Sequence, residues 1–373
     1  MKQVCLVCDR TAPQATLFCQ DARCPAERAP LLLDRGDRLE DLEIVAPVAA
    51  LRAAVLYNAR RGDQPVLLKV AHSDPRAAER LKREARLLGE LLGRDGRPPP
   101  GLPTLLGPYS GTNPREQPYG STMLGGQLLY FALFAPFDGQ PLSAFLARNP
   151  QPWVNHAGWI AHSFAVTVGQ LHSRGVLHLA LSPESALVRL GQNVLAPELL
   201  LCDLGLVASP ADVATGDPKR HVWHAHWYRE LAAPGYTAPE LVPSGQRGDA
   251  VGYHTDVYGV GLILYEMLIG RPAFPAARLD DESVYALVRA NRLPSMTRAL
   301  DAPSLAAVAN RAVSRQRYDD LQALDQAVIA VTGLPPVRRR RFWQQVERPL
   351  LAIAALLIIA FVVAFALDLA SIF

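Results

Sequence analysis

The sequence predicts an α+β protein with two unusual terminal segments. Short strand-like runs come early in the chain, and long, mostly apolar helices come later. Four cysteines lie close together near the start, and an uninterrupted apolar run lies near the end. The 373 residues are enough for one large domain of two lobes, or two ordinary domains, plus appendages. The formal net charge of +3 is too small to argue for nucleic acid as a partner.

The first part of the body is predicted to be a small sheet followed by a helix. Residues 42–60 and 64–72 look like short strands, with a turn at the Arg-Arg-Gly-Asp sequence between them. The Ser-Asp-Pro sequence that begins at Ser73 supplies a helix N-cap followed by proline at the first helical position. A helix over residues 76–93 is therefore expected.

The remaining elements of the body follow a proline- and glycine-rich stretch. Residues 93–126 are predicted to be a long irregular insertion. Residues 128–142 look like a buried strand that leads into a linker, and residues 159–175 like a long apolar helix. Residues 200–207 look like a buried strand ending on an acid and a glycine, and residues 255–270 like a largely buried helix.

The cysteine cluster favours a structural zinc site. Cys5 and Cys8 form a C-x-x-C pair, and Cys19 and Cys24 form a second pair with a wider spacing. Four thiolates within such a short segment can surround zinc, and metal binding would supply most of the folding energy of residues 1–36. Disulfides or unrelated free thiols are the alternatives. A closed four-cysteine site leaves no open position for chemistry, so a docking or structural role is expected.

The C-terminal apolar run predicts a membrane anchor. Residues 350–367 contain no charged or polar side chain, and a helix of this length covers most of the hydrocarbon layer. Arg338–Arg341 and Trp343 precede it, which favours a cytoplasmic body. We expect a basic linker over residues 334–348 and a single transmembrane helix over 349–368, in a cell inner membrane or plasma membrane. A buried core helix is the alternative.

Seven short motifs follow one another between Leu39 and Gly333. They are, in order, VLLKV around Lys69, REARLL around Glu84, HLALSPES from His178, DLG from Asp203, GYTAPE ending at Glu240, TDVYGVGLILYEML around Asp256, and RAVSRQRYDDL around Arg317. In this order they resemble the motifs of bacterial serine/threonine protein kinases. The resemblance implies a two-lobed protein-kinase-like fold over residues 37–333.

The resemblance also implies a site for ATP and magnesium. Lys69 and its partner Glu84 would contact the nucleotide, although the pair could equally serve to lock the helix to the sheet. Asp203 would hold magnesium, with an acid that caps a turn as the alternative. By the same comparison Phe134 narrows the back of the nucleotide pocket, and the linker from Ala135 to Phe137 touches adenine.

The catalytic loop departs from the family pattern. His178 is kept, but Leu179 replaces an arginine, and Ala180 replaces the aspartate that accepts the proton of the substrate hydroxyl. Ser182 replaces a lysine, and Ser185 replaces the asparagine that binds a second metal ion. The loss of general-base assistance alone is typically worth ~10²–10⁴ in rate.

The turn expected to hold the phosphates, within residues 46–57, contains no glycine. Backbone amides approach phosphates poorly when every residue carries a Cβ atom. We therefore expect nucleotide to be held loosely or not at all.

Two interpretations follow from these residues. In the first, the chain is a membrane-anchored pseudokinase that acts as a signalling or scaffolding module, because the structural residues Glu240, Asp256 and Arg317 persist while the chemical ones do not. In the second, it is a slow or atypical ATP-dependent serine/threonine kinase, in which positioning alone supplies the rate. No protein partner, substrate or signal can be identified from the sequence, and nucleic acid is not expected.

Overall fold

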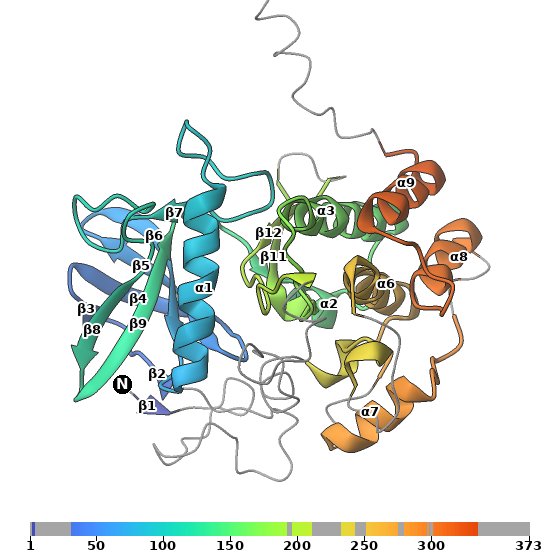
Figure 1. Cartoon of the computed structure of the whole chain (residues 1–373), viewed down its shortest axis with the longest axis horizontal. Coiled ribbons are helices and arrows are strands. Elements are labelled where there is room, and N and C mark those ends of the chain that lie inside the picture. The colour runs from blue at the N-terminus through green and yellow to red at the C-terminus, as the bar shows by residue number, and fades with distance from the viewer. Residues whose placement is uncertain are drawn as a thin grey trace, which may run out of the picture. The chain divides into compact units, whose positions relative to one another are not determined.

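The body of the protein has two lobes, a sheet-rich lobe followed by a mostly helical one (Figure 1). The computed structural model describes residues 2–3, 31–191, 196–210, 233–242, 251–274, 280–296, 298 and 301–334. The body ends at Thr332, and a second unit begins at Gly333. The two-lobed arrangement predicted from the sequence is thus confirmed.

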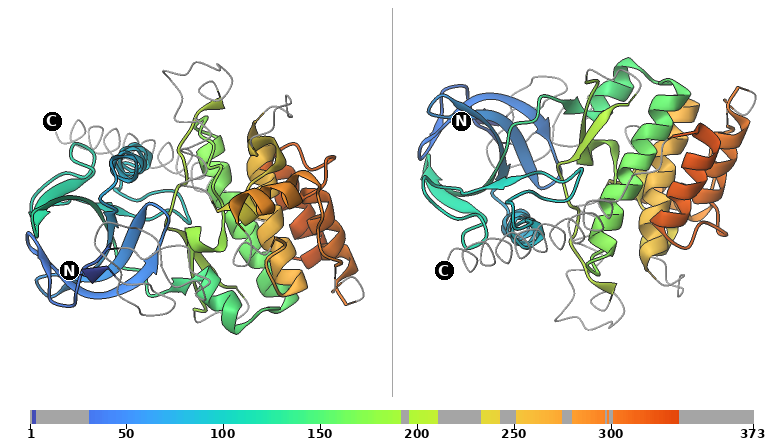
Figure 2. Two further views of the ribbon diagram at one scale, coloured as in Figure 1. Left: turned by 90° about the horizontal axis from the view of Figure 1, so that it is seen from below. Right: turned by 90° about the horizontal axis from the view of Figure 1, so that it is seen from above.

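The first lobe is built on a curved antiparallel sheet (Figure 2). Its seven described strands lie in the order β3-β4-β5-β6-β9-β7, with β8 paired to β9, and a separate β1-β2 pair precedes them. The bounds are β1 Lys2–Gln3, β2 Leu31–Leu32, β3 Arg38–Leu39, β4 Leu42–Ala50, β5 Ala54–Arg61, β6 Gln64–Ala71, β7 Leu105–Leu106, β8 Gly120–Leu124 and β9 Gln127–Phe134. The insertion at residues 93–126 therefore contains two short strands, and the prediction that it is irregular throughout is wrong.

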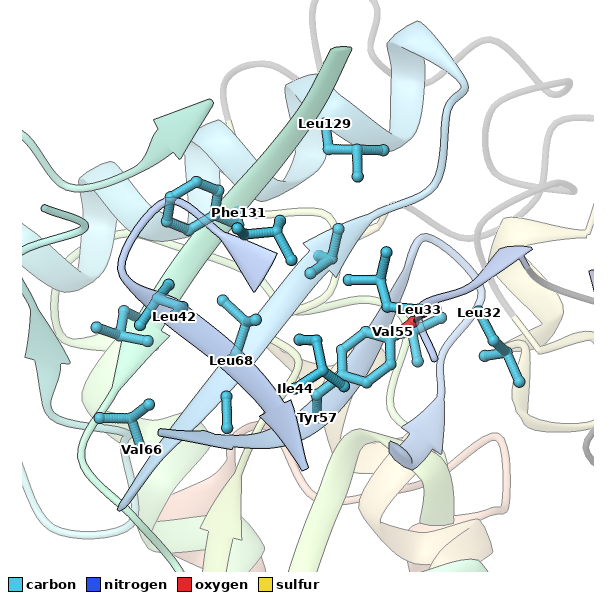
Figure 3. Close-up of a cluster of buried hydrophobic side chains, with 14 residues drawn as sticks. Leu32, Leu33, Leu42, Ile44, Val55, Tyr57, Val66, Leu68, Leu129 and Phe131 are labelled. Carbon is cyan, nitrogen blue, oxygen red and sulfur yellow. Dashed lines mark hydrogen bonds between the residues drawn. The ribbon is translucent and has the colours of Figure 1, made fainter. Parts of the chain in front are cut away.

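Apolar side chains on one face of this sheet form the core of the first lobe (Figure 3). The beginning of β4 alternates as a half-buried strand should, with Leu42 and Ile44 buried and Glu43 exposed. The phenol of Tyr57 on β5 lies inside the same core, and its hydroxyl accepts a hydrogen bond from the Leu33 amide at 3.1 Å. This bond satisfies the polar end of an otherwise apolar side chain.

Helix α1 (Pro75–Leu91) packs against β6 and β9. Asp74 is its N-cap, and the carboxylate accepts a hydrogen bond from the Arg76 amide at 3.2 Å. Pro75 occupies the first helical position, as the sequence predicts, and the helix ends two residues before Gly93. The capped start fixes where the buried face of α1 lies relative to the sheet.

The second lobe consists of helices that stack around α6 (Figure 2). Its regular elements are β10 Gln140–Pro141, α2 Leu142–Arg148, α3 Val154–His172, β11 Ala186–Arg189, β12 Glu198–Leu201, α6 Tyr253–Ile269, α7 Asp281–Arg289, α8 Pro303–Ala312 and α9 Leu321–Thr332. Short 3₁₀ turns cover Pro183–Ser185, Pro234–Tyr236 and Pro239–Leu241. Helix α6 is apolar on nearly every face because α3, α8 and α9 contact it. A Cβ atom on Gly261 would lie 2.6 Å from that of Ala312, so this glycine permits the close approach of α6 and α8.

Most of the two predicted terminal segments falls outside the described residues. Cys5, Cys8, Cys19 and Cys24, residues 335–348 of the basic linker and the expected span at 349–368 all belong to the undescribed part of the chain. Within the described ranges no helix is both long and apolar enough to span a bilayer. The same ranges contain no group of three or more His, Cys, Asp or Glu side chains placed to hold a metal ion. The zinc site and the anchor remain predictions.

Candidate active site

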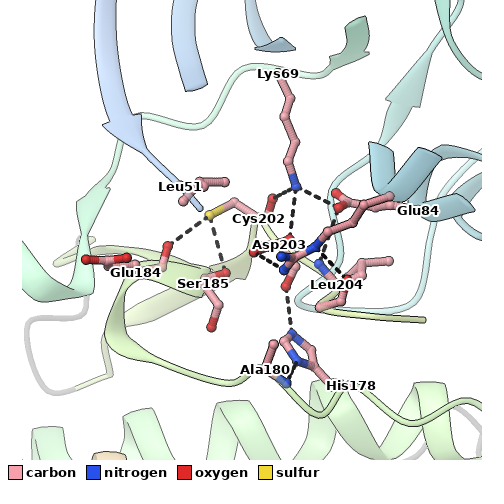
Figure 4. A network of polar contacts seen from close by, with 12 residues as sticks. Leu51, Lys69, Glu84, His178, Ala180, Glu184, Ser185, Cys202, Asp203 and Leu204 are labelled. Carbon is pink, nitrogen blue, oxygen red and sulfur yellow. Dashed lines mark hydrogen bonds and ion pairs between the residues drawn. The ribbon is translucent and has the colours of Figure 1, made fainter. Parts of the chain in front are cut away.

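A buried lysine on β6 lies at the centre of the candidate site, between the two lobes (Figure 4). The Nζ atom of Lys69 donates to Glu84 Oε2 at 2.6 Å, to the Cys202 carbonyl at 3.1 Å and to Asp203 Oδ1 at 3.2 Å. Burial alone would lower the pKa of Lys69, but the carboxylates of Asp203 and Glu84 outweigh it and raise the pKa above its ordinary value. The expected lysine–glutamate pair is present, and Asp203 joins it.

A second buried cation, which the sequence analysis did not identify, also binds Asp203. Arg80 on α1 donates from Nη2 to Asp203 Oδ2 at 2.7 Å and from Nε to the Gly205 carbonyl at 2.8 Å. Burial alone would raise the pKa of Asp203, but the charges of Arg80 and then Lys69 hold it well below its usual range. Both carboxylate oxygens of Asp203 are therefore paired with cationic side chains of the protein itself.

A buried carboxylate on α6 binds the backbone of the loop that follows α3. Asp256 on α6 accepts hydrogen bonds from the backbone amides of His178 and Leu179, at 2.8 and 2.6 Å, and from His172 Nε2 at 2.8 Å. Leu179 adopts a left-handed conformation with φ of 63°, which is unusual for a residue with a branched side chain. Asp256 thus holds a strained loop in place, as the family resemblance implies.

His178 connects this loop to the strand end that carries Asp203. Its Nε2 atom lies 2.7 Å from the Asp203 carbonyl, and its Nδ1 accepts from the Ala180 amide at 3.2 Å. These partners require a neutral ring that is protonated on Nε2. Burial lowers the pKa of His178, against the opposing effects of Asp256 and Asp203, which is consistent with that neutral state. His178 therefore has a structural role.

The positions that depart from the family pattern offer no substitute for the missing groups. The methyl group of Ala180 packs against an apolar cluster that includes Leu179. The hydroxyl of Ser185 donates to the Ser182 carbonyl at 2.6 Å and accepts from the Ser182 amide at 3.3 Å. Ser185 is thus occupied in closing its own turn, and the side chain at 180 cannot accept a proton.

The glycine-free turn between β4 and β5 is packed against the second lobe. Leu51 is 3% exposed, and its carbonyl lies 2.9 Å from His72 Nε2. Ala53, also buried, belongs to the same apolar cluster as Ala77 of α1 and Leu179 of the loop. The turn that the resemblance assigns to phosphates therefore makes apolar contacts with α1 and with the catalytic loop.

The predicted adenine linker begins at the end of β9. Phe134 is fully buried and pairs with Leu67 of β6 and Leu105 of β7. The Ala135 amide donates to the Thr104 carbonyl at 2.9 Å. The ring of Phe137 lies 4.8 Å from the Arg189 guanidinium. The linker is therefore anchored by protein contacts at both of its predicted contact residues.

A buried carboxyl group secures the described part of the GYTAPE segment. The hydroxyl of Tyr236 donates to Glu266 of α6. Burial raises the pKa of Glu266 to about 7, and the bond from Tyr236 only partly opposes this shift. The folded protein consequently binds a proton at Glu266 more tightly than the unfolded chain does.

We expect this group to give stability a specific pH dependence. Because the folded state binds more protons, the free energy of unfolding should fall as pH rises from 4.5, the ordinary glutamate value, to about 7. The slope from one group is at most ~1.4 kcal/mol per pH unit. Urea titrations across this range, compared with Glu266→Gln, measure it. A slope that is the same in the glutamine variant would contradict the assignment.

The family resemblance implies ATP and Mg²⁺ at this site, but the side chains here do not fit them as arranged. Mg²⁺ requires about six oxygen ligands in octahedral geometry, usually including one or two carboxylates. Both oxygens of Asp203 are paired with Lys69 and Arg80. The hydroxyl of Ser185 bonds within its own turn. Lys69 already makes three bonds to protein acceptors, so none of its donors is directed to a phosphate.

Comparison with known proteins agrees with this architecture. Residues 133–316 match the family described as protein kinase domain. The serine/threonine-protein kinase PknD of Chlamydia pneumoniae is 26% identical over 308 residues, covering 75% of this chain and 30% of that protein. PkaA of Streptomyces coelicolor is 29% identical over 163 residues, 44% of this chain and 27% of the relative. The chain thus spans less than a third of the length of either relative.

A solved structure gives the same picture of the fold. The PknI kinase domain of Mycobacterium tuberculosis, solved as a double mutant, superposes with a TM-score of 0.50 at 18% identity. The match covers 81% of this chain and all of that domain. The chain therefore has the two-lobed protein kinase fold, and about half of it matches the protein kinase domain family and is similar in sequence to bacterial serine/threonine kinases.

Proposed function

We propose that this chain is a pseudokinase, a kinase fold that acts as a membrane-anchored signalling or scaffolding module. The observation that carries the proposal is the methyl side chain of Ala180, packed in an apolar cluster at the position of the catalytic base. A methyl group has no lone pair with which to remove a proton from an incoming hydroxyl. Phosphoryl transfer to serine or threonine would lack general-base assistance.

The intact framework supports a binding role. Asp256 still holds the catalytic loop, and Arg317 still forms a two-point ion pair with Glu240, at 3.0 and 3.2 Å. A module that only presents surfaces needs these structural bonds and does not need a base. The predicted zinc segment, at residues 1–36, would add a docking surface, and the predicted span at 349–368 would hold the body at the cytoplasmic face of the inner or plasma membrane.

A slow or atypical serine/threonine kinase is the second candidate. Lys69, Glu84 and Asp203 are in mutual contact, within 3.2 Å through the lysine Nζ atom. This is the constellation that would bind Mg–ATP in the resemblance, and positioning alone can supply part of a rate enhancement. The two candidates differ in whether any phosphate is transferred.

Phosphate incorporation from labelled ATP tests the proposal. The full chain, purified in detergent, is incubated with Mg²⁺ or Mn²⁺ and a generic protein substrate, beside an active kinase as positive control. We expect incorporation no faster than in a Lys69→Ala variant, because the missing base alone removes ~10²–10⁴ in rate. Metal-dependent incorporation that disappears in Lys69→Ala would establish the slow kinase instead.

A further inference from the structure

We infer that Arg80 is a built-in counter-cation that takes the place of a divalent metal ion at Asp203 and excludes Mg²⁺ from the cleft. The inference deepens the proposed function and rests on it, since it concerns the same site. It differs in kind, because it concerns which ions the cleft accepts and not whether phosphate is transferred.

The geometry places the guanidinium at the carboxylate oxygen that the lysine leaves available. Arg80 Nη2 lies 2.7 Å from Asp203 Oδ2, while Lys69 Nζ lies 3.2 Å from Oδ1. A further bond from Arg80 Nε to the Gly205 carbonyl, at 2.8 Å, fixes the plane of the guanidinium. Gly205 follows Asp203 by two residues, so both bonds hold the same short segment. Two charge-assisted contacts from one rigid group make a strong and specific attachment.

Among the described residues, the charged side chains paired in this buried cluster balance one another. Lys69 and Arg80 supply two positive charges, and Glu84 and Asp203 supply two negative ones. The four side chains are between 2% and 11% exposed, so water screens their interactions only weakly. A divalent ion entering beside Asp203 would leave an excess of two positive charges in a buried site. It could enter only if Arg80 moved away and broke the two bonds described above.

The surrounding residues keep Arg80 in that position. Arg80 lies one helical turn after Ala77 on α1, and Ala77 belongs to the same buried apolar cluster as Ala53 of the glycine-free turn. Arg83, one turn further on, donates to the Val207 carbonyl at 2.9 Å. Helix α1 is thus attached to the segment after Asp203 by two arginines. Several contacts of α1 would therefore have to change before Arg80 could leave Asp203.

Manganese binding by the full chain tests this inference without reference to activity. Mn²⁺ is titrated into the protein, without and with ATP, and bound Mn²⁺ is measured by water-proton relaxation. The same titration is run on Asp203→Asn. Only the Mn²⁺ binding that is lost in this variant is assigned to the cleft. We expect no such signal in the wild-type protein. In Arg80→Gln the Asp203-dependent signal should appear, with Mn²⁺ bound at least about tenfold to a hundredfold more tightly than the weakest binding the titration can detect in the wild type, because the variant removes a competing charged hydrogen bond at the ligand.

Arg83→Gln is the matched control, since it removes a guanidinium from the same helix without touching Asp203. It should behave as the wild type. Asp203-dependent Mn²⁺ binding by the wild-type protein would overturn the inference, and this measurement does not depend on any Arg80 variant folding. Absence of a gain in a folded Arg80→Gln protein, checked by circular dichroism, would also overturn it. Phosphate transfer without metal binding would refute the proposed function but not the inference about Arg80.

Discussion

Replacing Asp256 with alanine is expected to lower the free energy of unfolding by about 3–5 kcal/mol. The carboxylate is fully buried and accepts from two backbone amides, those of His178 and Leu179, and from His172 Nε2. Alanine would remove the acceptor that these donors share and would release Leu179 from its left-handed conformation. Denaturation by urea, followed by circular dichroism, measures the loss.

Asp256→Asn is the matched control because it keeps the shape and one acceptor oxygen. It should lose less stability than the alanine variant. Burial alone would raise the pKa of Asp256, but the hydrogen bond and charge of His172 outweigh it and lower the pKa below its ordinary value. The charge therefore stabilises the fold above the ordinary aspartate pKa and stops doing so as pH falls through the lower folded value. The gap between wild type and Asp256→Asn should narrow at acid pH. An alanine variant as stable as wild type would show that the loop needs no such support.

The sequence predicted the residues whose local context is distinctive. Lys69 stands in a short apolar strand, Glu84 in a helix that follows a clear N-cap, and Asp203 at the end of a buried strand. A charged residue in such surroundings must find a partner, so its position carries information about contacts that are distant in the chain. The structure brings these three residues together around one ammonium group.

Arg80 was not predictable in the same way. Helix α1 also carries Arg76, Lys82, Arg83 and Arg86, and in the sequence these five basic residues look alike. Arg80 lies four residues before Glu84, which places both on one face of the helix, but a solvated pair at this spacing is common. What distinguishes Arg80 is that it is 5% exposed and contacts a segment 123 residues away. That depends on tertiary packing, which no local pattern encodes.

The turn between β4 and β5 was only partly predictable. The absence of glycine predicts that backbone amides approach phosphates poorly there, but it did not indicate where the side chains would go. Ala53 is buried in an apolar cluster that includes Leu179 of the catalytic loop, and Leu51 is buried as well. Exposing apolar side chains to water costs free energy, so the turn is more stable when a neighbouring apolar surface covers these residues.

Replacing Arg317 with alanine is expected to destabilise the second lobe by about 3–5 kcal/mol. Its guanidinium binds both oxygens of Glu240, at 3.0 and 3.2 Å, and lies 4.9 Å from the ring of Tyr258. The Glu240 side chain is 1% exposed, so the variant would leave a buried carboxylate without its main partner. Glu240 belongs to the GYTAPE segment. Thermal or urea unfolding of the full chain should measure the loss of stability directly. Arg315→Ala, which removes an exposed arginine two residues away, should change stability by less than ~0.5 kcal/mol.

A double-mutant cycle separates the ion pair from the other contacts of Arg317. Glu240→Gln alone should also destabilise the protein, since it leaves Arg317 without its charged partner in a partly buried position. If the two groups act as a pair, the double variant Arg317→Ala, Glu240→Gln should be more stable than the sum of the single losses predicts, by roughly 1–3 kcal/mol. Strictly additive losses would mean that the ion pair contributes little. The persistence of this motif in a chain without a catalytic base would then need an explanation other than stability.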